Sequence, residues 1–468
     1  MKCMPKRPRL LLDLSTSLAW RGKHAVGIVR TEREIATRLL DDPALCVIPV
    51  VYHDHAFRAL ELEFARSLIA LVPASAEVPL PKPKSRIRSG AQPIHRKVAN
   101  AIMQPLARLI TAIARELIKS VPIRSREEVR QSLLHARQAL RQFSSRRAPV
   151  LHSPETQNLG IVIYPQATDV LFLCGLGWDV IDWRHLSSLR LTSGLRIISV
   201  LYDLIPIKFP EFLGAPGDYY YNYFIHIIDN CEKVFCISKR TEADLKEFIS
   251  NNGRSPVSTE VIYLGANLPA KPDPTEIIDL KVRERLARGR FALAVGTVEI
   301  RKNHSLLIDL WDELLADPSF DLDLVIVGMP GWCADDVIAR LEGLRGFGSR
   351  VLWFKQMSDA GLSWLYEQCH ISLFPSLYEG LGLPVIEALQ HGRPVIASNR
   401  GAIPEAGLGL ATILDPDDRA GWRAAVIAAS RAPRQVVNVG PERFPNWERT
   451  VATIKRGIRD VMLTDTVA

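Results

Sequence analysis

The chain has 468 residues, of which 47% are hydrophobic and 24% are charged, and its formal net charge is +8. This balance excludes a fibrous or wholly disordered chain, and a single hydrophobic core stops growing at about 250 to 300 residues, so the length predicts two domains. The seven cysteines are scattered without a C-x-x-C pair, which indicates reduced thiols rather than a zinc or redox site.

The amino-terminal segment is not expected to be a signal peptide, because the apolar run that follows Arg9 is already interrupted at Asp13. The sequence also lacks an uninterrupted apolar stretch of roughly 18 residues, which argues against a membrane-spanning helix. We therefore expect a cytoplasmic protein.

The first part of the chain alternates between strand and helix patterns. Residues 9–15 predict a strand, and residues 29–40 follow with helical spacing. Further apolar bursts that predict strands occupy residues 170–174, 196–202, 234–237 and 261–264. Such alternation predicts a parallel sheet covered by helices.

A strongly basic insertion, residues 81–150, interrupts this pattern. Residues 82–147 hold sixteen Lys and Arg against three Glu, so this segment carries more than the whole net charge and the rest of the chain is mildly acidic. Its only aromatic residue is Phe143, so nucleic acid is not an expected partner. Residues 97–119 have amphipathic helical spacing, which fits either an anionic membrane surface bound through 81–147 or packing on the amino-terminal sheet.

The second part of the chain again alternates between strand and helix patterns. Residues 268–275 are rich in proline, and we place an interdomain linker at 269–280. Strands are then predicted at 291–295, 322–327, 351–354, 371–374 and 394–397, with a helix at 304–315. We expect two doubly wound, Rossmann-like α/β domains, 1–268 and 281–445, that face each other across a ligand-binding cleft.

The most informative stretch is residues 374–397, where a buried strand is followed by a glycine-rich loop and a helix that starts near Pro384. Glu379 lies on the loop, and Glu387 is predicted in the first turn of the helix. Backbone N–H groups of the loop and the helix end are suited to a diphosphate, and Glu387 is suited to the paired hydroxyls of a ribose. The alternative is that both glutamates only cap the helix. The predicted donor-binding residues of this loop are Gly380, Leu381, Gly382 and Leu383.

A second cluster follows the first strand of the second domain. There Gly296 and Thr297 precede Arg301 and Lys302, and Asn303 is a suitable N-cap for the next helix. Two cations beside a helix start suit an anion, and they would neutralise a departing diphosphate. An ordinary solvated Arg–Lys pair is the alternative.

At these residues the chain resembles the retaining glycosyltransferases of family four, which have the GT-B fold. Glu379 and Glu387 match the paired-glutamate motif with seven intervening residues, and the resemblance implies that Glu387 binds the nucleotide ribose and Glu379 contacts the donor sugar. It implies further that Lys302 binds the diphosphate. Arg301 stands in for an arginine usual elsewhere in the family, as in the Glu-x-Arg-Lys-Asn variant of polysaccharide mannosyltransferases.

The amino-terminal half carries two shorter matches. Residues 26–30 resemble the family's Thr-Gly-Ile-x-Arg loop, which implies that Gly27 allows close approach of donor or acceptor. Residues 200–206 resemble a His-Asp-Leu-Ile-Pro segment with Tyr202 in the histidine position. Asp203 is then a catalytic candidate that contacts sugar or acceptor hydroxyls, or it caps a turn. Trp447 resembles the aromatic residue that starts the family's final helix, 446–468, which crosses back to the first, acceptor-binding domain.

The resemblance implies a retaining transfer of a hexose without a metal ion or cofactor, the nucleotide-diphosphate sugar being a substrate. GDP-mannose is the first expectation for the donor and a glycan or lipid-linked oligosaccharide of surface polysaccharide synthesis for the acceptor; a UDP-hexose or deoxysugar donor is the alternative. The acidic pair Asp321 and Asp323 imitates a metal motif but only precedes a strand. Rival functions are a noncatalytic membrane-docked adaptor of the same fold and a nucleotide-sugar epimerase. The expected location is the cytoplasm, with peripheral attachment to the inner face of the plasma membrane as the alternative.

Overall fold

A computed structural model describes residues 8–21, 27–70, 159–213, 217–266, 268, 271–277, 279–344 and 349–463, all of which belong to one compact unit. The basic segment 82–147, including the helix predicted at 97–119, lies outside the described residues, and so does Val26. The predicted linker 269–280 is described only in part. The proposed domain boundaries therefore stay a prediction.

The first sheet has the strand order β4-β3-β2-β1-β5-β6-β7-β8. Its central strands pair in parallel, as in β6, whose six residues are all buried because helices cover both faces. The strands of this sheet are β1 (Arg9–Asp13), β2 (Cys46–His53), β3 (Ala56–Leu60), β4 (Leu159–Val162), β5 (Val170–Leu173), β6 (Arg196–Leu201), β7 (Cys231–Cys236) and β8 (Ser258–Val261).

The strand predicted at 261–264 is misplaced, because β8 ends at Val261. Ile262 and Leu264 are buried, but outside the sheet, and the carbonyl of Tyr263 between them accepts a hydrogen bond from Thr450 Oγ1 at 2.5 Å. Burial beneath the last helix, rather than strand pairing, explains why these positions are apolar.

The edge formed by β2, β3 and β4 was not predicted from the sequence. β3 runs antiparallel to both β2 and β4, and β2 and β3 are joined through Asp54 and His55. Both residues have positive φ, 48° and 54°, as two-residue hairpins of the primed types require. An Asp-His pair is a weak sequence signal for such a turn, since the usual signal is Asn or Asp followed by Gly.

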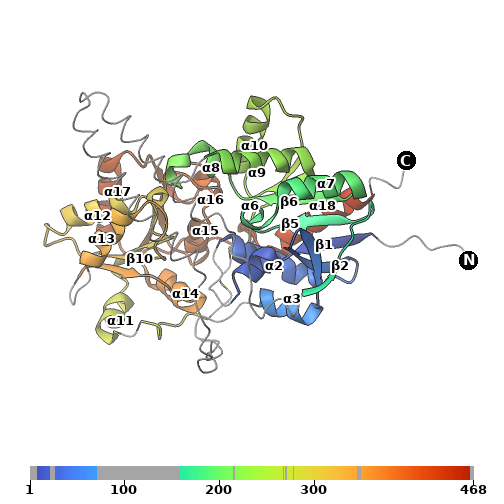
Figure 1. Cartoon of the computed structure of the whole chain (residues 1–468). Helices are drawn as coiled ribbons and strands as arrows, with labels where there is room; N and C mark the ends of the chain where they lie inside the picture. Colours follow the sequence, from blue (N-terminus) through green and yellow to red (C-terminus); the bar gives the residue numbers. More distant parts are fainter. Residues whose placement is uncertain are drawn as a thin grey trace, which may run out of the picture. The chain divides into compact units, whose positions relative to one another are not determined.

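Helices cover both faces of the first sheet (Figure 1). Leu10 and Leu12 of β1 face α2 and α3, whereas Leu11 faces the helices α7, α9 and α10 on the other side. The helices are α1 (Ser15–Ala19), α2 (Ile28–Leu40), α3 (Leu62–Ile69), α6 (Gly177–Val180), α7 (Trp183–Ser193), α8 (Ile205–Lys208), the 3-10 helix η3 (Pro210–Phe212), α9 (Gly217–Asn230) and α10 (Lys239–Asn251). These elements form the N-terminal lobe.

The second sheet is entirely parallel, with the order β11-β10-β9-β12-β13-β14. Five of its strands coincide with the predicted ones to within a residue, and the short β14 was missed. They are β9 (Phe291–Val295), β10 (Asp323–Val327), β11 (Val351–Phe354), β12 (Ile371–Phe374), β13 (Val395–Ser398) and β14 (Thr412–Leu414). The helices are α11 (Leu280–Ala287), η4 (Ile300–Lys302), α12 (His304–Leu314), α13 (Asp335–Gly343), α14 (Asp359–Gln368), α15 (Leu383–Gln390), α16 (Ile403–Ala406), α17 (Arg419–Arg431) and η5 (Pro441–Arg443). These elements form the C-terminal lobe.

The last helix, α18 (Trp447–Leu463), packs against α2, β5 and β7 of the N-terminal lobe (Figure 1). Two glycines make this packing possible. A Cβ on Gly457 would lie 2.6 Å from the Phe235 ring, and one on Gly265 would lie 2.6 Å from Trp447. The chain therefore returns from the C-terminal to the N-terminal lobe, and one hydrophobic cluster includes residues of both lobes.

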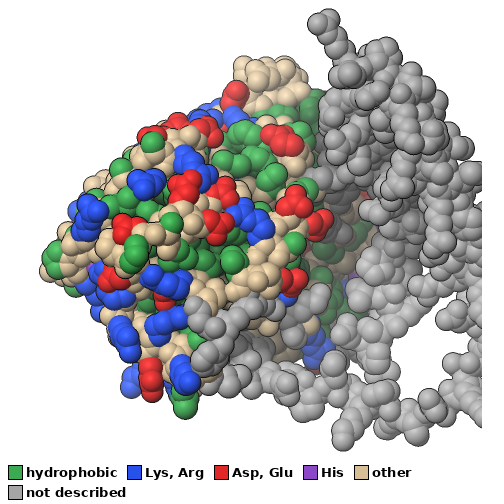
Figure 2. Space-filling model, turned by 90° about the vertical axis from the view of Figure 1, so that its left-hand side faces the viewer, with side chains coloured by type: hydrophobic (Ala, Val, Ile, Leu, Met, Phe, Trp, Pro, Cys, Tyr) green, Lys and Arg blue, Asp and Glu red, His purple; other side chains and the backbone are tan. Residues whose placement is uncertain are grey.

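One face of the C-terminal lobe carries acidic and basic side chains side by side (Figure 2). Ion pairs join its helices, for example Arg340 of α13 with Asp309 of α12 at 2.7 Å, and Arg419 of α17 with Glu313 of α12. Such exposed pairs contribute only about 0 to 1 kcal/mol each. Among the described helices, none has the combination of length and hydropathy that crossing a bilayer requires.

Candidate functional site

A cavity of about 410 Å³ lies between the two lobes, where the carboxyl ends of strands from both sheets meet. Asp203 follows β6, Gly296 follows β9, and Glu379 follows β12. All the site residues predicted from the sequence line this one cavity. They are Gly27, Asp203, Gly296, Thr297, Arg301, Lys302, Glu379, Gly380, Leu381, Gly382, Leu383 and Glu387.

Glu379 is held by the two predicted cations. One carboxylate oxygen accepts a hydrogen bond from Arg301 Nη1 at 2.5 Å, and the other accepts one from Lys302 Nζ at 2.6 Å. Burial alone would raise the pKa of Glu379, but the two cations outweigh it and lower the pKa to about 2. Glu379 is therefore an anion at neutral pH.

Arg301 is more buried and more extensively bonded than a solvated turn residue. Its Nη2 donates to Glu299 Oε1 at 2.5 Å, and its Nη1 also donates to the carbonyl of Tyr378 at 3.0 Å. Burial disfavours the charged guanidinium, yet Glu379, Glu299 and Asp203 raise its pKa above the ordinary value. Glu299 lies in the Glu-x-Arg-Lys-Asn stretch, but its pairing with Arg301 was not predicted.

Asn303 occupies the predicted N-cap position of α12 without capping through its side chain. It has a left-handed backbone, with φ of 55°, and its Nδ2 donates to the carbonyl of Pro375 at 3.3 Å. The carbonyl of Arg301 accepts a hydrogen bond from the N–H of Leu377 at 2.7 Å. Both contacts attach the turn that carries the cations to the segment that leads into Glu379.

Glu387 lies in the second turn of α15, not the first, because the helix begins at Leu383. Tyr366 of α14 donates its hydroxyl to Glu387 Oε2 at 3.0 Å, and Arg30 of α2 lies 3.6 Å from Oε1. Burial raises the pKa of Glu387 above its ordinary value, against the opposing influence of Arg30 and Tyr366. Neither neighbour was predicted, although Arg30 belongs to the Gly-Ile-x-Arg stretch.

The glycine loop is shaped by close contacts as well as by its exposed backbone. A Cβ on Gly380 would lie 2.3 Å from the carbonyl oxygen of Tyr202 in the other lobe. Gly382 precedes α15 with φ of 99°, a conformation that favours glycine. Residues 296–302 form the turn that carries Arg301 and Lys302, the cation turn. Here a Cβ on Gly296 would approach Lys302 Cε to 3.2 Å. The glycines thus bring both loops close to their neighbours.

The N-terminal lobe contributes a turn and a helix start to the cavity. Asp203 Oδ1 accepts a hydrogen bond from the N–H of Ile205 at 3.1 Å, so the residue does cap a turn while lining the cavity. Burial raises its pKa to about 6, although Arg301 opposes the shift. Tyr202 donates its hydroxyl to the carbonyl of Cys174 at 2.5 Å. Gly27 precedes α2 with φ of 53° and has open space where a Cβ would lie.

The two aspartates of the metal-like motif are paired with arginines. Asp321 accepts from Arg290 Nε at 2.8 Å, and Asp323 accepts from Arg350 Nε at 2.8 Å. Within the described ranges no group of three or more His, Cys, Asp or Glu side chains is suited to a metal ion. Asp321 and Asp323 thus have structural partners outside the cavity lining.

Residues 289–431, which contain both clusters of the site, match the family described as glycosyl transferases group 1. The predicted resemblance to glycosyltransferases is confirmed. Serotype-specific mannosyltransferase WbdA of Escherichia coli is 30% identical over 221 residues, which cover 45% of this chain and 27% of that protein. O-antigen chain mannosyltransferase B of Escherichia coli is 26% identical over 227 residues, 48% of this chain and 58% of that protein. The chain thus spans less than two thirds of the length of these relatives.

The fold has a counterpart among solved glycosyltransferase structures. Sucrose-phosphate synthase from Thermosynechococcus elongatus superimposes with a TM-score of 0.51 at 21% identity, over 74% of this chain and 81% of that one. This likeness, together with the two sheets, confirms the predicted GT-B fold of two doubly wound α/β domains. The role of each site residue stays a prediction.

Proposed function

We propose that the protein is a metal-independent, retaining glycosyltransferase that transfers a hexose, mannose from GDP-mannose in the first instance, to a lipid-linked oligosaccharide. The observation that carries this proposal is the shared cavity, in which Arg301 and Lys302 adjoin the glycine loop and Glu387 lies on the helix that follows. The two relatives named as mannosyltransferases support mannose as the sugar, and the O-antigen chain in the name of one of them supports a surface polysaccharide as the product.

The cation turn provides the electrostatic part of the reaction. When the bond between the sugar and the diphosphate breaks, negative charge accumulates on the departing phosphate. Arg301 and Lys302 are fixed in place before that charge develops, which is the condition for effective transition-state stabilisation. The N–H groups at the start of α15 add partial positive charge on the same side.

The carboxylate of Glu387 provides recognition of the nucleoside. A buried carboxylate that keeps an unfilled acceptor position is suited to the paired hydroxyls of a ribose. Tyr366 occupies one oxygen of Glu387, and Arg30 lies beyond hydrogen-bond distance from the other. Charge-assisted hydrogen bonds of this kind contribute about 1.5 to 3 kcal/mol each.

Glu379 acts as an anion and not as a general acid, because its pKa of about 2 keeps it ionised. The positive charge that develops at the anomeric carbon is stabilised by this carboxylate. Its two oxygens already accept hydrogen bonds from Arg301 and Lys302, which makes it a weak nucleophile. The acceptor hydroxyl therefore attacks from the face that the diphosphate leaves, the new C–O bond replaces the old one, and the departing phosphate takes the hydroxyl proton.

The test is incubation of the protein with labelled GDP-mannose, UDP-glucose or a deoxysugar nucleotide, with and without a membrane lipid extract. The expected result is nucleotide release and label transfer that require both GDP-mannose and the extract. Transfer from another donor would favour the alternative donor, conversion of free donor without extract would indicate an epimerase, and absence of turnover with every donor would indicate an adaptor.

Donor affinity gives a second, independent test. Lys302→Ala and Glu387→Ala should each abolish measurable GDP binding by calorimetry while the far-ultraviolet circular dichroism stays unchanged. Arg459→Ala is a suitable control, because Arg459 lies on α18 and does not line the cavity. Its side chain is half exposed, and its ion pair with Asp42 is long, at 3.8 Å. Unchanged affinity in the two site variants would contradict the assigned roles. Membrane association through 81–147 remains a prediction alongside this function.

A further inference from the structure

Three consecutive residues of the C-terminal lobe, Tyr378, Glu379 and Gly380, form a short segment at the boundary with α10 of the N-terminal lobe. Tyr378 and Gly380 both make hydrogen bonds to that helix, whereas Glu379 between them faces the cation turn. We propose that the amino-terminal turns of α10 position Glu379 for the reaction, with Tyr378 and Asp244 as positioning residues. This inference rests on the proposed function.

The contact on one side of Glu379 is the phenol of Tyr378. Its hydroxyl donates to Asp244 Oδ2 at 2.5 Å and accepts from Arg240 Nε at 2.8 Å. The ring packs on Phe209, with the centroids 4.7 Å apart. Tyr378 is only 6% exposed, so its hydroxyl has no ready substitute partner in solvent. The side chain is therefore fixed by the opposite lobe.

Asp244 has partners in its own lobe besides Tyr378. It is 3% exposed, and its Oδ1 accepts from Arg240 Nη2 at 2.5 Å and from Lys208 Nζ at 2.8 Å. Losing the phenol would therefore leave the carboxylate paired with two cations of its own lobe. A Tyr378→Phe variant should fold and should lose mainly the connection between the lobes.

The contact on the other side of Glu379 is the carbonyl of Gly380. It accepts hydrogen bonds from Ser238 Oγ at 2.6 Å and Thr241 Oγ1 at 3.2 Å, the N-cap and first turn of α10. Because a Cβ here would lie 2.3 Å from the carbonyl of Tyr202, only glycine allows this approach. Glu379 thus lies between two contacts to the same helix.

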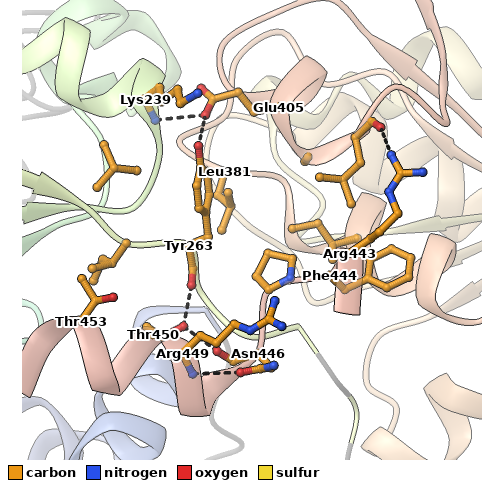
Figure 3. Close-up of a pocket in the computed structure, with 16 residues that line it drawn as sticks. Lys239, Tyr263, Leu381, Glu405, Arg443, Phe444, Asn446, Arg449, Thr450 and Thr453 are labelled. Atoms are coloured by element: carbon orange, nitrogen blue, oxygen red, sulfur yellow. Dashed lines mark hydrogen bonds between the residues drawn. The ribbon is translucent and has the colours of Figure 1, made fainter. Parts of the chain in front are cut away.

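A third contact holds the start of α10 on the C-terminal lobe. The carboxylate of Glu405 in α16 accepts hydrogen bonds from the N–H of Lys239 at 3.0 Å and from the hydroxyl of Tyr263 at 3.4 Å (Figure 3). It also accepts one from the N–H of Arg240 at 2.8 Å. An acidic side chain at a helix N-terminus is stabilising. The start of α10 is therefore held on the same lobe that carries Glu379.

The direct consequence concerns the geometry of the cation cluster. Arg301 donates both to Glu379 Oε2 and to the carbonyl of Tyr378. Its hydrogen bonds therefore depend on the position of the same segment that contacts α10. If this segment moves, Glu379 changes its distance from the reacting sugar. Lys302 keeps its place over the Phe374 ring, with Nζ 5.0 Å from the centroid, and Glu387 keeps its hydrogen bond from Tyr366. Loss of the α10 contacts should lower turnover more than donor affinity.

The first experiment compares Tyr378→Phe with Tyr221→Phe in the full chain. Tyr221 is 40% exposed and its hydroxyl bonds Asn252, so its replacement is a matched control for loss of a phenolic hydroxyl. The expected result is a kcat about tenfold lower for Tyr378→Phe, KM for the donor within about twofold, and wild-type values for Tyr221→Phe. An unchanged kcat in Tyr378→Phe, or a fall in kcat/KM that comes wholly from a higher KM, would overturn the inference.

A double-mutant cycle with Asp244→Asn adds a second criterion. If both residues act through one contact, the double variant should be no slower than the slower single variant. Multiplied effects would show that they act separately and would refute the proposed coupling. Glu247→Gln is the control, since Glu247 also pairs with Lys208 but is largely exposed.

Amide hydrogen exchange provides a readout that does not need the donor to be known. Faster exchange in the peptide over 376–383 is expected for Tyr378→Phe and not for Tyr221→Phe, and equal exchange in both would contradict the inference. Wild-type protein that transfers no sugar would instead contradict the proposed function, with the exchange result still deciding whether α10 positions this segment.

Discussion

The loop that carries Glu379 and the helix that carries Glu387 contain the same kind of side chain in opposite electrostatic settings. Both carboxylates are buried and line one cavity. Arg301 and Lys302 overcome burial at Glu379 and lower its pKa to about 2, whereas burial prevails at Glu387 and raises its pKa. The nearest cation to Glu387, Arg30, is 3.6 Å away, compared with 2.5 and 2.6 Å for the cations at Glu379.

The difference in surroundings suits the two glutamates to different partners. A carboxylate already paired with two cations can stabilise positive charge but has little capacity for new hydrogen bonds. A carboxylate with one phenolic donor can still accept hydroxyl groups of a ligand. The cations at Glu379 are also partly neutralised by this carboxylate, so under the proposed function a bound diphosphate would share them with it.

The largest effect is expected from Glu379→Gln, which removes the charge and keeps the shape. The kcat should fall by about 10²- to 10³-fold, the usual cost of losing one electrostatic group in an active site. GDP should meanwhile bind about tenfold more tightly, since Arg301 and Lys302 then lack their competing anion. Steady-state kinetics and calorimetry measure the two quantities. Weaker GDP binding would show that Glu379 does not compete with the diphosphate.

A smaller effect, in affinity, is expected from the isosteric Glu387→Gln. An amide oxygen still accepts hydrogen bonds but lacks charge, so GDP affinity should fall by about 10- to 100-fold, and kcat at saturating donor should change little. The variant therefore reverses the pattern of Glu379→Gln. A fall confined to kcat would contradict the assignment of Glu387 to the nucleoside.

The smallest effect is expected from Tyr366→Phe, which changes only the support of Glu387. Glu387 binds hydroxyls best when it is ionised, so GDP affinity should rise with pH through the pKa of Glu387. The phenol lowers this pKa by donating to the carboxylate, so its removal raises the pKa and moves the affinity profile to higher pH. At neutral pH the loss should be a few-fold, about 0.5 to 1.5 kcal/mol.

Calorimetric titrations of GDP over a range of pH measure this shift, with Tyr221→Phe as the control for loss of a phenol. The profile of Glu379→Gln should keep the wild-type midpoint, because the pKa of Glu379 lies far below the working range. A profile of Tyr366→Phe that moved to lower pH would reverse the sign expected here and exclude Tyr366 as a donor to the ionised carboxylate.

Much of the fold and the location of the site could be predicted from the sequence. The strands at 291–295, 351–354 and 371–374 coincide with β9, β11 and β12, because buried parallel strands are continuous apolar runs. Glycines next to Glu379 and the adjacent Arg301 and Lys302 follow strand ends, and such ends meet at one edge of each sheet. The local sequence pattern and the direction of the strands were together sufficient to predict that these residues lie in one site.

Only the tertiary structure decided what each side chain contacts. Tyr366 lies 21 positions before Glu387 and Asp244 lies 134 positions before Tyr378, so no local spacing could reveal either hydrogen bond. The antiparallel β3 and β4, separated by the insertion, and the burial of Ile262 beneath α18 are likewise long-range outcomes. Sequence fixes which groups stand at the strand ends because that depends on local periodicity, whereas pairing and ionisation depend on neighbours that folding alone brings within a few ångströms.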